Sequence, residues 1–386
     1  MIAKGIFWVS LCSIVYTYLL YPLILKVFVS LRPRRRTCPE PEPMPDVALL
    51  IPAYNEEFVI REKIENSLSI DYEQSKLEIV VASDGSQDHT NRIVREFKNG
   101  GVRLLAYPRR EGKVNVINKS VPQISAEIIV LSDANTMYER PAIRELVRHF
   151  SSREVGCVCG ELRLVNSCQD TDGNCERLYW DYERALKRME GEIGTVLGAN
   201  GAIYAIRRDL FEPLPSDTII DDFVLSMKIA AKGYRIVYEP KAVGVEHTQS
   251  LRDEFRRRVR IGVGNFQSVR MLRSLLNPLK GLIAFSFWSH KLLRWMVPFC
   301  LVGAIVSNLF LLEGPFYRTA LAGQTSFYIF ALLGMLKTTK KLKLLLLDFA
   351  HYFVTLNVAL FCGFLKFLVG WVSPVWTPTK RNPKAI

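Results

Sequence analysis

The sequence lacks the regular cysteine and histidine patterns that hold a structural metal or a disulfide framework. Its eight cysteines are scattered, and the closest group, Cys157, Cys159, Cys168 and Cys175, matches no standard zinc spacing. We interpret these cysteines as buried free thiols in a reducing compartment. The chain also has no internal repeat, and its one low-complexity stretch is a short proline-rich segment. A disulfide-stapled module, a zinc module and a repeat protein are therefore excluded.

Long apolar runs are absent from the middle of the chain and present at both ends. Residues 47–270 are rich in charge, whereas 6–29 and roughly 282–372 consist mainly of Leu, Val, Phe, Ile, Ala and Gly. A bilayer requires apolar runs of about 20 residues, and a soluble core cannot easily absorb them. We therefore predict four parts: an N-terminal transmembrane helix (1–31), a proline-rich linker (32–46), a soluble domain (47–270), and interfacial and transmembrane helices with a basic tail (271–386).

The net charge of +13 points to a membrane surface rather than to nucleic acid. Basic clusters flank the apolar segments at 32–36, 337–343 and 380–384, where positive charge marks the cytoplasmic side and attracts anionic lipids. No nucleic-acid recognition motif is present. We expect a multi-pass protein of the cell membrane with a cytoplasmic soluble domain and with membrane lipids, not nucleic acid, among its partners.

The apolar segments at the two ends of the chain do not all predict the same kind of membrane helix. Residues 6–29 are long for a signal peptide and are followed by a basic cluster, which favours an anchor. Residues 295–312 and 320–336 predict two crossings, and 270–293 an amphipathic interfacial helix. Residues 344–371 are long enough to cross, but basic clusters on both sides leave an interfacial, a re-entrant or a broken helix (at Gly363) open.

Strand and helix patterns alternate in the first half of the soluble domain. Short apolar runs at 47–53, 77–84, 102–107 and 127–134 are separated by helical segments. This alternation predicts an α/β fold with a parallel sheet covered on both faces. Ligands of such sheets bind beyond the carboxyl ends of the strands, so 54–57, 84–88 and 133–135 are the first candidates. Helices at 175–189 and 251–275, and a turn, a strand, a helix and a strand between 198 and 240, are expected to follow.

Several polar residues are candidates for chemistry. Asp133 and Asn135 could present oxygens to Mg²⁺ or Mn²⁺, which take few carboxylates when substrate phosphates also bind; a simple Asx turn is the alternative. Asp221 and Asp222 open a helix, so one is expected to cap it while the other faces a cleft as a general base. Gly112 and Lys113 precede another helix and form either a diphosphate cradle or an ordinary surface loop.

The order of the motifs resembles the membrane-bound glycosyltransferase family 2, which includes cellulose, hyaluronan, chitin and poly-N-acetylglucosamine synthases. The motifs are PAYNEE, SDGSQDHT, GK followed by N and IN, SDAN, GANGAIYAIRR, and IDDF followed by GYRIVYEP. The resemblance covers about residues 46–270 and extends to WTPTKR near the end of the chain. It implies a GT-A fold, in which a mixed α/β sheet binds a UDP-sugar.

The resemblance also implies roles for individual residues. Pro52, Tyr54 and Glu56 would line the uridine site, with Asp84 at the base. Lys113 and Asn118 would lie near the nucleotide and diphosphate, and Asp133 and Asn135 would bind Mg²⁺ or Mn²⁺, with Asn135 replacing an acid of the family motif. Gly198, Asn200 and Gly201 would face the acceptor. Asp222 would be the base, and Asp221 replaces the glutamate that precedes it in the family. His247 could complete a metal site or be a surface histidine.

The largest departure falls on the family's Q-x-x-R-W motif. The aligned stretch keeps Arg260, which could hold the leaving diphosphate, but has Arg257 for Gln and Ile261 for Trp. Loss of an aromatic stacking platform leaves both processive synthesis and transfer of one or a few sugars open. We predict inverting transfer from a UDP-sugar to a saccharide or lipid acceptor, with Arg257 near the acceptor, in cell-surface glycan synthesis. Two alternatives remain: a non-catalytic scaffold that binds a nucleotide sugar, and a transporter. A partner subunit that supplies acceptor contacts is also compatible with the sequence.

Overall fold

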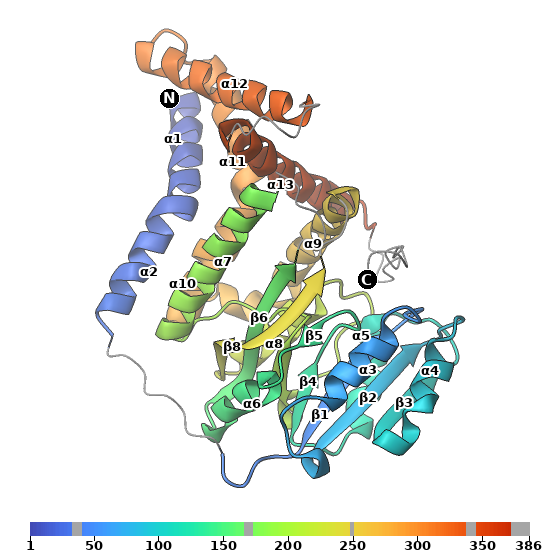
Figure 1. The fold of residues 1–386 in the computed structure, drawn as a ribbon. Coiled ribbons are helices and arrows are strands. Elements are labelled where there is room, and N and C mark those ends of the chain that lie inside the picture. Colours follow the sequence, from blue (N-terminus) through green and yellow to red (C-terminus); the bar gives the residue numbers. More distant parts are fainter. Residues whose placement is uncertain (33–40, 166–172, 248–250, 337–344, 372–386) are drawn as a thin grey trace.

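The protein consists of an α/β domain and a group of long apolar helices (Figure 1). The computed structural model describes residues 1–32, 41–165, 173–247, 251–336 and 345–371. Most of the proline-rich linker, the WTPTKR motif and the basic tail lie outside these residues. The chain starts among the apolar helices, passes through the α/β domain, and returns to the apolar helices.

One eight-stranded sheet runs through the described part of the α/β domain, in the order β3-β2-β1-β4-β7-β6-β8-β5. The strands are β1 (Val47–Ala53), β2 (Leu77–Asp84), β3 (Val102–Tyr107), β4 (Ile128–Leu131), β5 (Met137–Tyr138), β6 (Val155–Val165), β7 (Tyr204–Arg207) and β8 (Arg235–His247). β1 is parallel to β2 and β4, and β2 to β3, as expected from the alternation. β7 is antiparallel to both β4 and β6, so the sheet is mixed rather than wholly parallel.

Helices cover both faces of the sheet. They are α3 (Ile60–Leu68), α4 (Thr90–Glu96), α5 (Lys113–Ser120), α6 (Ala142–Val147) and α8 (Asp221–Ala231). Successive residues of a strand point to opposite faces. Ala48 and Leu50 of β1 accordingly pack in a buried cluster with α5 and α8, whereas Leu49 and Ile51 pack with α3, α4 and α6. The two clusters form the core that positions the strand ends.

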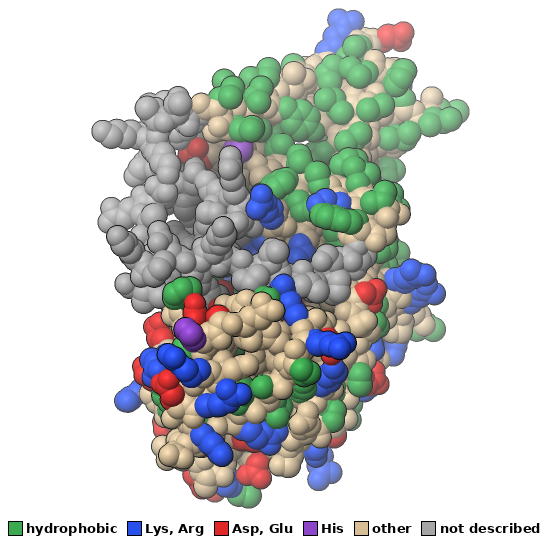
Figure 2. Space-filling model, turned by 90° about the vertical axis from the view of Figure 1, so that its right-hand side faces the viewer, with side chains coloured by type: hydrophobic (Ala, Val, Ile, Leu, Met, Phe, Trp, Pro, Cys, Tyr) green, Lys and Arg blue, Asp and Glu red, His purple; other side chains and the backbone are tan. Residues whose placement is uncertain are grey.

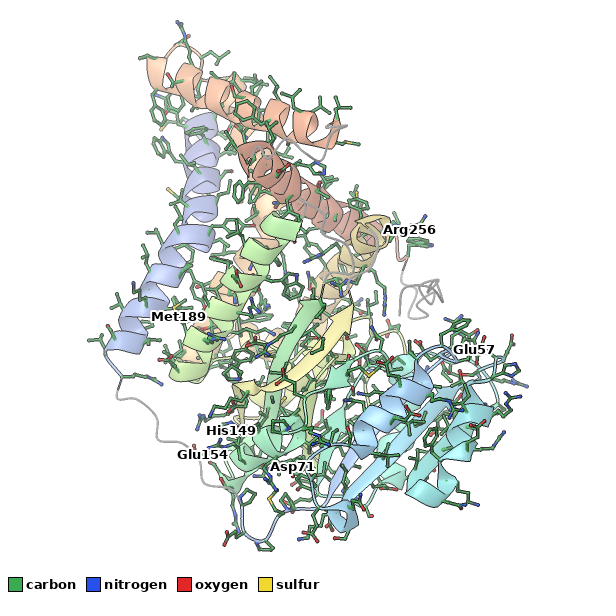
Figure 3. The ribbon with its side chains drawn as sticks, in the orientation of Figure 1. Glu57, Asp71, His149, Glu154, Met189 and Arg256 are labelled. Atoms are coloured by element: carbon green, nitrogen blue, oxygen red, sulfur yellow. The ribbon has the colours of Figure 1, made fainter. Side chains whose placement is uncertain are left out.

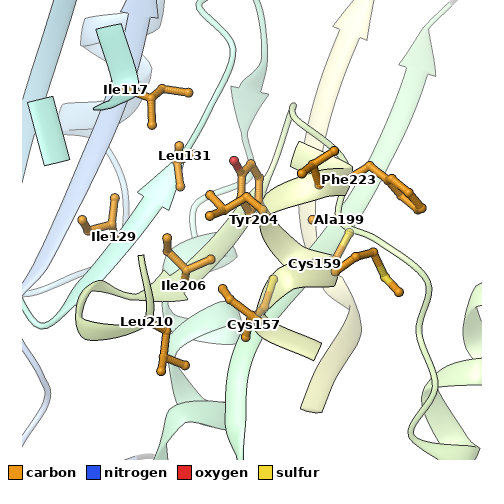
Figure 4. Packing of buried hydrophobic residues seen from close by; sticks show 14 of the residues in the cluster. Ile117, Ile129, Leu131, Cys157, Cys159, Ala199, Tyr204, Ile206, Leu210 and Phe223 are labelled. Carbon is orange, nitrogen blue, oxygen red and sulfur yellow. The ribbon is translucent and has the colours of Figure 1, made fainter. Parts of the chain in front are cut away.

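The buried cluster that includes residues of α5 and α8 also contains two of the cysteines (Figure 4). Cys157 and Cys159 of β6 are fully buried free thiols, packed beside Tyr204 of β7. The interpretation as core thiols is confirmed for these two. Cys168 and the side chain of Cys175 lie outside the described residues.

Within the described residues, four helical segments are long and apolar enough to cross a membrane: Ile2–Ser30, Leu282–Leu309, Pro315–Leu336 and Leu346–Leu368. The first comprises α1 (Ile2–Val15), a π-helical turn and α2 (Tyr21–Ser30), and the second α10 (Leu282–Ser286), a π-helical turn and α11 (Leu293–Leu309). The others are α12 (Pro315–Leu336) and α13 (Leu345–Leu368). Hydrophobic side chains dominate this part of the surface, while charges of both signs cover the α/β domain (Figure 2). The segments indicate membrane association.

Two details of the apolar part differ from the pattern expected from sequence. Residues 282–293, expected in an interfacial helix, continue directly into α11. α13 is unbroken at Gly363, so the broken-helix alternative is wrong. A side chain at Gly363 would lie 2.8 Å from backbone atoms of Gly262. The two glycines therefore bring α13 into close contact with the helix that carries Gly262.

That helix, α9 (Leu251–Met271), and α7 (Gly173–Ile193) connect the two parts of the molecule. Tyr21 of α2 donates a hydrogen bond of 2.9 Å to Glu190 of α7. Gln267 of α9 accepts one of 3.1 Å from the backbone N–H of Ile219, just before α8. The apolar helices are thus fixed against the segments that lead to α8.

Candidate active site

The predicted site residues lie at one edge of the sheet, where β1, β2 and β4 end and antiparallel β7 begins. In Figure 3, Glu57 after β1 lies at the upper right of the α/β domain, on the same side of the view as Arg256 of α9. Asp71, His149 and Glu154 lie at the opposite side. The candidate site is therefore at the end of the sheet that faces α9.

Hydrogen bonds join the loops that follow β1 and β2. The backbone N–H of Asn55 donates to Ser86 Oγ (3.1 Å), and the N–H of Gln87 donates to Asn55 Oδ1 (2.9 Å). Asn55 has a φ of 52°, a left-handed conformation that Asn tolerates better than most residues. Beside it, the guanidinium carbon of Arg110 lies 3.8 Å from the ring centroid of Tyr54. This end of the site thus offers a flat, positively charged surface.

Two other residues predicted at the nucleoside end lie in the same region. Pro52 is partly buried near the end of β1. Glu56 is buried, and its backbone N–H donates to Thr90 Oγ1 at 2.8 Å. The hydrogen bond of Glu56 therefore helps to set the path of the loop that carries Tyr54.

Asp84 at the end of β2 orders the segment that leads to Lys113. Its Oδ1 accepts the N–H of Glu111 (2.6 Å) and its Oδ2 accepts the N–H of Gly112 (2.8 Å). Gly112 has a φ of 95°, which only glycine adopts readily, and α5 begins at the next residue. Asp84 therefore fixes the start of α5 and, with it, the position of Lys113.

Lys113 and Asp133 form a direct ion pair at the centre of the site. Lys113 Nζ lies 2.6 Å from Asp133 Oδ1 and 3.8 Å from Asp221 Oδ2. Burial opposes the charged form of Lys113, but Asp133 and Asp221 outweigh it and raise the lysine pKa. Burial likewise opposes ionisation of Asp133, yet Lys113 lowers the pKa of this carboxyl below its usual value. Both groups are therefore charged at neutral pH.

Asp222 lies in the first turn of α8 and faces the loop before β7. Its Oδ2 accepts the backbone N–H of Gly201 at 2.6 Å, and its Oδ1 accepts the N–H of Phe223 at 2.8 Å. Burial and the neighbouring charge of Asp221 raise the pKa of Asp222 to about 6. A carboxylate with this pKa is a better proton acceptor than an ordinary aspartate and remains ionised at pH 7.

Asp221 is the more buried acid of the pair. Its Oδ2 has no hydrogen-bond partner among the described residues, although Lys113 lies 3.8 Å away. Arg260 of α9 donates to the carbonyl of Ile219 (3.4 Å) just before this pair. Burial lowers the pKa of Arg260, while Asp221, Asp222 and Asp133 act in the opposite direction. Arg260 is therefore close enough to be attracted by all three acids of the site.

The glycine-rich loop before β7 fits closely against α8. A side chain on Gly198, which has a φ of 86°, would lie 2.3 Å from the ring of Phe223. A side chain on Gly201 would lie 3.2 Å from Asp222 Oδ2 and 3.4 Å from Lys113 Nζ. Asn200 Oδ1 accepts the N–H of Ala202 (3.2 Å) and stabilises the turn. The absence of side chains at both glycines allows the loop to reach Asp222.

Three predicted residues have surroundings that differ from the centre of the site. Both polar groups of the Asn118 side chain bind the backbone of Leu214, at 2.8 and 3.0 Å. Arg257 is exposed on α9, and its charge favours ionisation of Glu246. Asn135 is partly buried, two residues after Asp133. The side chain of His247 lies outside the described part of the chain.

Two residues of the site were not predicted from sequence. Lys63 on α3 is fully buried behind the loop after β4, where its Nζ donates to Ser132 Oγ (2.8 Å) and to the carbonyl of Thr136 (2.5 Å). Glu246 of β8 accepts a hydrogen bond from the Thr136 hydroxyl. A signal for Lys63 did exist, because it falls among the buried positions of an amphipathic helix, next to Ile64. Glu246 offered no such signal.

The residues around Asp133 fit a divalent cation that is shared with a diphosphate. Among the described residues, no group of three or more His, Cys, Asp or Glu side chains could hold a metal alone. Asp133, whose side chain is 38% exposed, and the amide oxygen of Asn135 could supply two oxygen ligands. Mg²⁺ and Mn²⁺ accept such sparse protein ligation when phosphate oxygens complete the shell.

Comparison with known sequences agrees with this geometry. Residues 45–264 match the family described as glycosyltransferase like family 2. The chain is 27% identical over 333 residues to a probable glycosyltransferase, YdaM, of Bacillus subtilis (strain 168), covering 81% of this chain and 78% of that protein. It is 27% identical over 203 residues to the poly-beta-1,6-N-acetyl-D-glucosamine synthase of Staphylococcus aureus (strain COL), covering 51% of this chain. That match spans 48% of the synthase, about half its length.

The fold is similar to that of the mannosyltransferase PcManGT from Pyrobaculum calidifontis, solved in complex with GDP-Man and Mn²⁺. The TM-score is 0.74 at 22% identity, and the match covers 95% of this chain and 99% of that one. This similarity includes the mixed sheet and the apolar helices. The chain therefore belongs to glycosyltransferase family 2, and it is a glycosyltransferase whose GT-A-like domain lies between long apolar helices at the two ends of the sequence.

Proposed function

We propose that this enzyme transfers a sugar, with inversion, from a UDP-sugar to a saccharide or lipid-linked acceptor at the cytoplasmic face of the cell membrane. The observation that supports it most is the position of Asp222. Its carboxylate, held by the Gly201 N–H at 2.6 Å and with a pKa raised to about 6, lies beside the Lys113–Asp133 pair. A base next to a cationic diphosphate site is what direct displacement at a sugar carbon requires.

The donor would extend along the strand ends. Pro52, Tyr54, Glu56 and Asp84 would bind or order the nucleoside end, with Arg110 on the Tyr54 ring adding positive charge. Lys113 and Arg260 would offset the charge that develops on the leaving diphosphate. Asn118 would act through the backbone of Leu214 rather than by touching the nucleotide, because its amide is already paired.

Asp133 and Asn135 would hold Mg²⁺ or Mn²⁺, which supplies Lewis-acid stabilisation of the diphosphate when bound. Asp222 would remove the proton from the acceptor hydroxyl as that oxygen attacks the anomeric carbon from the side opposite the diphosphate. Asp221 would keep the pKa of Asp222 raised. Such a single displacement converts an α-linked donor into a β-linked product.

The acceptor would enter between the loop at Gly198, Asn200 and Gly201 and helix α9, near Arg257. The contact of Gly262 with Gly363 supports a lipid-linked acceptor, because it brings α9 against an apolar helix. Ile261 offers no aromatic ring on which a sugar chain could stack. Transfer of a single sugar to a lipid is therefore the second candidate beside synthesis of a cell-surface polysaccharide, and either could need a partner subunit.

The test is nucleotide release by the detergent-purified full chain across a panel of nucleotide sugars that includes UDP-N-acetylglucosamine, UDP-glucose and GDP-mannose. Each donor is assayed with Mn²⁺, with Mg²⁺ and with a chelator, and with and without a membrane lipid extract. Metal-dependent nucleotide release from a UDP-sugar would support the proposal. Release only from GDP-mannose would show that the donor is a GDP-sugar instead of a UDP-sugar. Silence with every donor and acceptor would favour a nucleotide-sugar scaffold without turnover.

A further inference from the structure

Asp133 has one close cationic partner among the described residues, and that partner reaches it directly. Lys113 Nζ lies 2.6 Å from Asp133 Oδ1, and no other basic side chain in the described part of the chain forms an ion pair with this carboxylate. The neighbouring position of the motif is the uncharged Asn135. A cation that binds Asp133 must therefore share its one carboxylate with the ammonium group of Lys113.

We propose that Lys113 competes with the divalent cation for Asp133, so that the enzyme binds Mn²⁺ tightly only together with the diphosphate of the nucleotide. This inference rests on the proposed function, since it takes the diphosphate to lie next to Lys113. It concerns the order and mutual dependence of binding rather than the identity of the metal ligands.

The charges around Asp133 explain why a free dication is disfavoured. Lys113 contacts the carboxylate of Asp133 directly. Lys63 donates hydrogen bonds to Ser132 and Thr136, which lie on either side of Asp133 in the loop after β4. The positive charge of Lys113, and that of Lys63 when it is protonated, therefore acts on the Asp133 carboxylate. An approaching dication would be repelled by the same charges.

Other acids near the site offset this repulsion only in part. Asp221 and Asp222 both interact with the ammonium group of Lys113, and Asp221 Oδ2 lies 3.8 Å from Nζ, farther than Asp133 Oδ1. Glu246 accepts a hydrogen bond from the hydroxyl of Thr136, so its carboxylate is already engaged by another residue of the loop after β4. Asp133 thus remains the carboxylate for which Lys113 and a metal would compete.

A diphosphate changes this balance. It brings at least two negative charges, gives Lys113 a second anionic partner, and supplies oxygen ligands that Mg²⁺ and Mn²⁺ prefer. Lys113 can then turn from Asp133 to the diphosphate while the metal takes its place. Because coupling between two ligands is reciprocal, the metal must also tighten nucleotide binding by the same factor.

A purely structural role for Lys113 makes the opposite prediction. If the lysine served only to stabilise the loop after β4, its removal would disorder Asp133 and weaken Mn²⁺ binding in every condition. Competition instead predicts that its removal strengthens Mn²⁺ binding when no nucleotide is present. The two roles therefore differ in the sign of one measured change.

The experiment measures free Mn²⁺ by electron paramagnetic resonance during titration of the detergent-purified full chain, alone and with UDP or GDP, against matched solutions without protein. The wild type is expected to bind Mn²⁺ about tenfold or more tightly with nucleotide than without it. In Lys113→Met, Mn²⁺ binding without nucleotide should tighten by about tenfold, and the effect of nucleotide should shrink accordingly. Lys119→Met is the matched control, because Lys119 lies on the same helix and forms an exposed pair of 2.6 Å with Glu111.

Two results would overturn the proposal. One is that the wild type binds Mn²⁺ equally tightly with and without nucleotide. The other is that, without nucleotide, Lys113→Met binds Mn²⁺ no more tightly than the wild type does. Lys113→Gln gives a polar second variant if the methionine variant does not fold, and the wild-type comparison stands without either. Mn²⁺ coupling in a protein that releases no nucleotide from any donor would remove the proposed function and keep this inference. Turnover of a donor without coupling between Mn²⁺ and nucleotide binding would remove this inference and keep the proposed function.

Discussion

Gly201 donates its backbone N–H to Oδ2 of Asp222 at 2.6 Å, across 21 residues of sequence. The contact joins the loop before β7 to the first turn of α8. It orients the carboxylate without neutralising it, because a backbone N–H carries no net charge. Any side chain at position 201 would approach both Asp222 and Lys113 within 3.4 Å. The glycine therefore keeps the space between the base and the diphosphate-binding lysine open.

Asp222→Asn is expected to reduce turnover by about a hundredfold to ten-thousandfold, the usual contribution of a general base. Asparagine retains the shape and can still accept from Gly201, so binding of the donor nucleotide should stay within about twofold of the wild type. Turnover is measured as nucleotide release, and binding by calorimetry. Asp209→Asn, an exposed change in the same domain, is the control. Wild-type turnover in Asp222→Asn would exclude this residue as the base.

The pH dependence of turnover should report the raised pKa of Asp222. Only the ionised carboxylate can accept a proton, so kcat/KM should be level above pH 7 and fall about tenfold per unit below pH 6. The charge of Asp221 contributes to that pKa, so Asp221→Asn should lower it and move the acid limb to lower pH. An acid limb that does not move in Asp221→Asn would contradict the electrostatic coupling of the two residues.

The parts of the fold that depend on local patterns could be predicted from sequence. β1, β2 and β4 are apolar runs followed by polar residues, and this pattern correctly predicts that Asp84 and Asp133 lie at strand ends. The antiparallel direction of β7 could not be predicted, because it depends on pairing with β4 and β6 across the sheet. The continuation of residues 282–293 into α11 was also missed, since polar residues such as His290 suggested a membrane surface.

The structure brings together the acids and the lysine that the sequence singles out, but the sequence did not identify the contacts behind them. Lys113 and Asp133 are 20 residues apart in sequence, and their ion pair depends on how Asp84 turns the chain into α5. Asn118 looked like a ligand residue, yet its amide binds the Leu214 backbone. Lys63 was overlooked because a single lysine in an amphipathic helix is normally solvated. The partners of these two side chains, Leu214 for Asn118 and Ser132 and Thr136 for Lys63, are distant in sequence, and local spacing does not identify them.

Lys63→Met should change how stability depends on pH. Burial lowers the pKa of Lys63 to about 7 in the folded protein, whereas the unfolded chain keeps a value near 10.4. Between these values the unfolded state binds more protons, so the free energy of unfolding of the wild type gains a contribution that increases with pH. Methionine cannot titrate and should remove that increase. The measurement is the melting temperature in detergent, with chelator, from pH 7 to 9.5.

The control for this change is Lys76→Met, which removes a lysine that donates to the carbonyl of Met44 at 2.6 Å, away from the site. It should keep the wild-type pH dependence. Because Lys63 also holds Ser132 and Thr136 on either side of Asp133 and Asn135, Lys63→Met should raise the KM for the donor several-fold more than it lowers kcat. If the melting temperatures of the wild type and of Lys63→Met change with pH in the same way, Lys63 is not the buried titrating group.

The contact between α9 and α13 should affect catalysis from outside the site. In Gly363→Ala the added methyl group would lie 2.8 Å from backbone atoms of Gly262, too close for the helices to keep their present distance. We expect a loss of stability of about 1–3 kcal/mol, the usual effect of overpacking. Since Gln267 of α9 binds the backbone of Ile219 just before α8, a displaced α9 should also move Asp222 and lower kcat.

Gly323→Ala on α12 is the matched control, because a methyl group there would meet no described atom within 4 Å. It should leave the melting temperature and kcat near their wild-type values, and replacement of glycine inside a helix could even stabilise it slightly. A lower kcat in Gly363→Ala with unchanged nucleotide binding would indicate that the apolar helices position the base through α9. Normal kcat despite a lower melting temperature would show that the contact stabilises the protein without reaching Asp222.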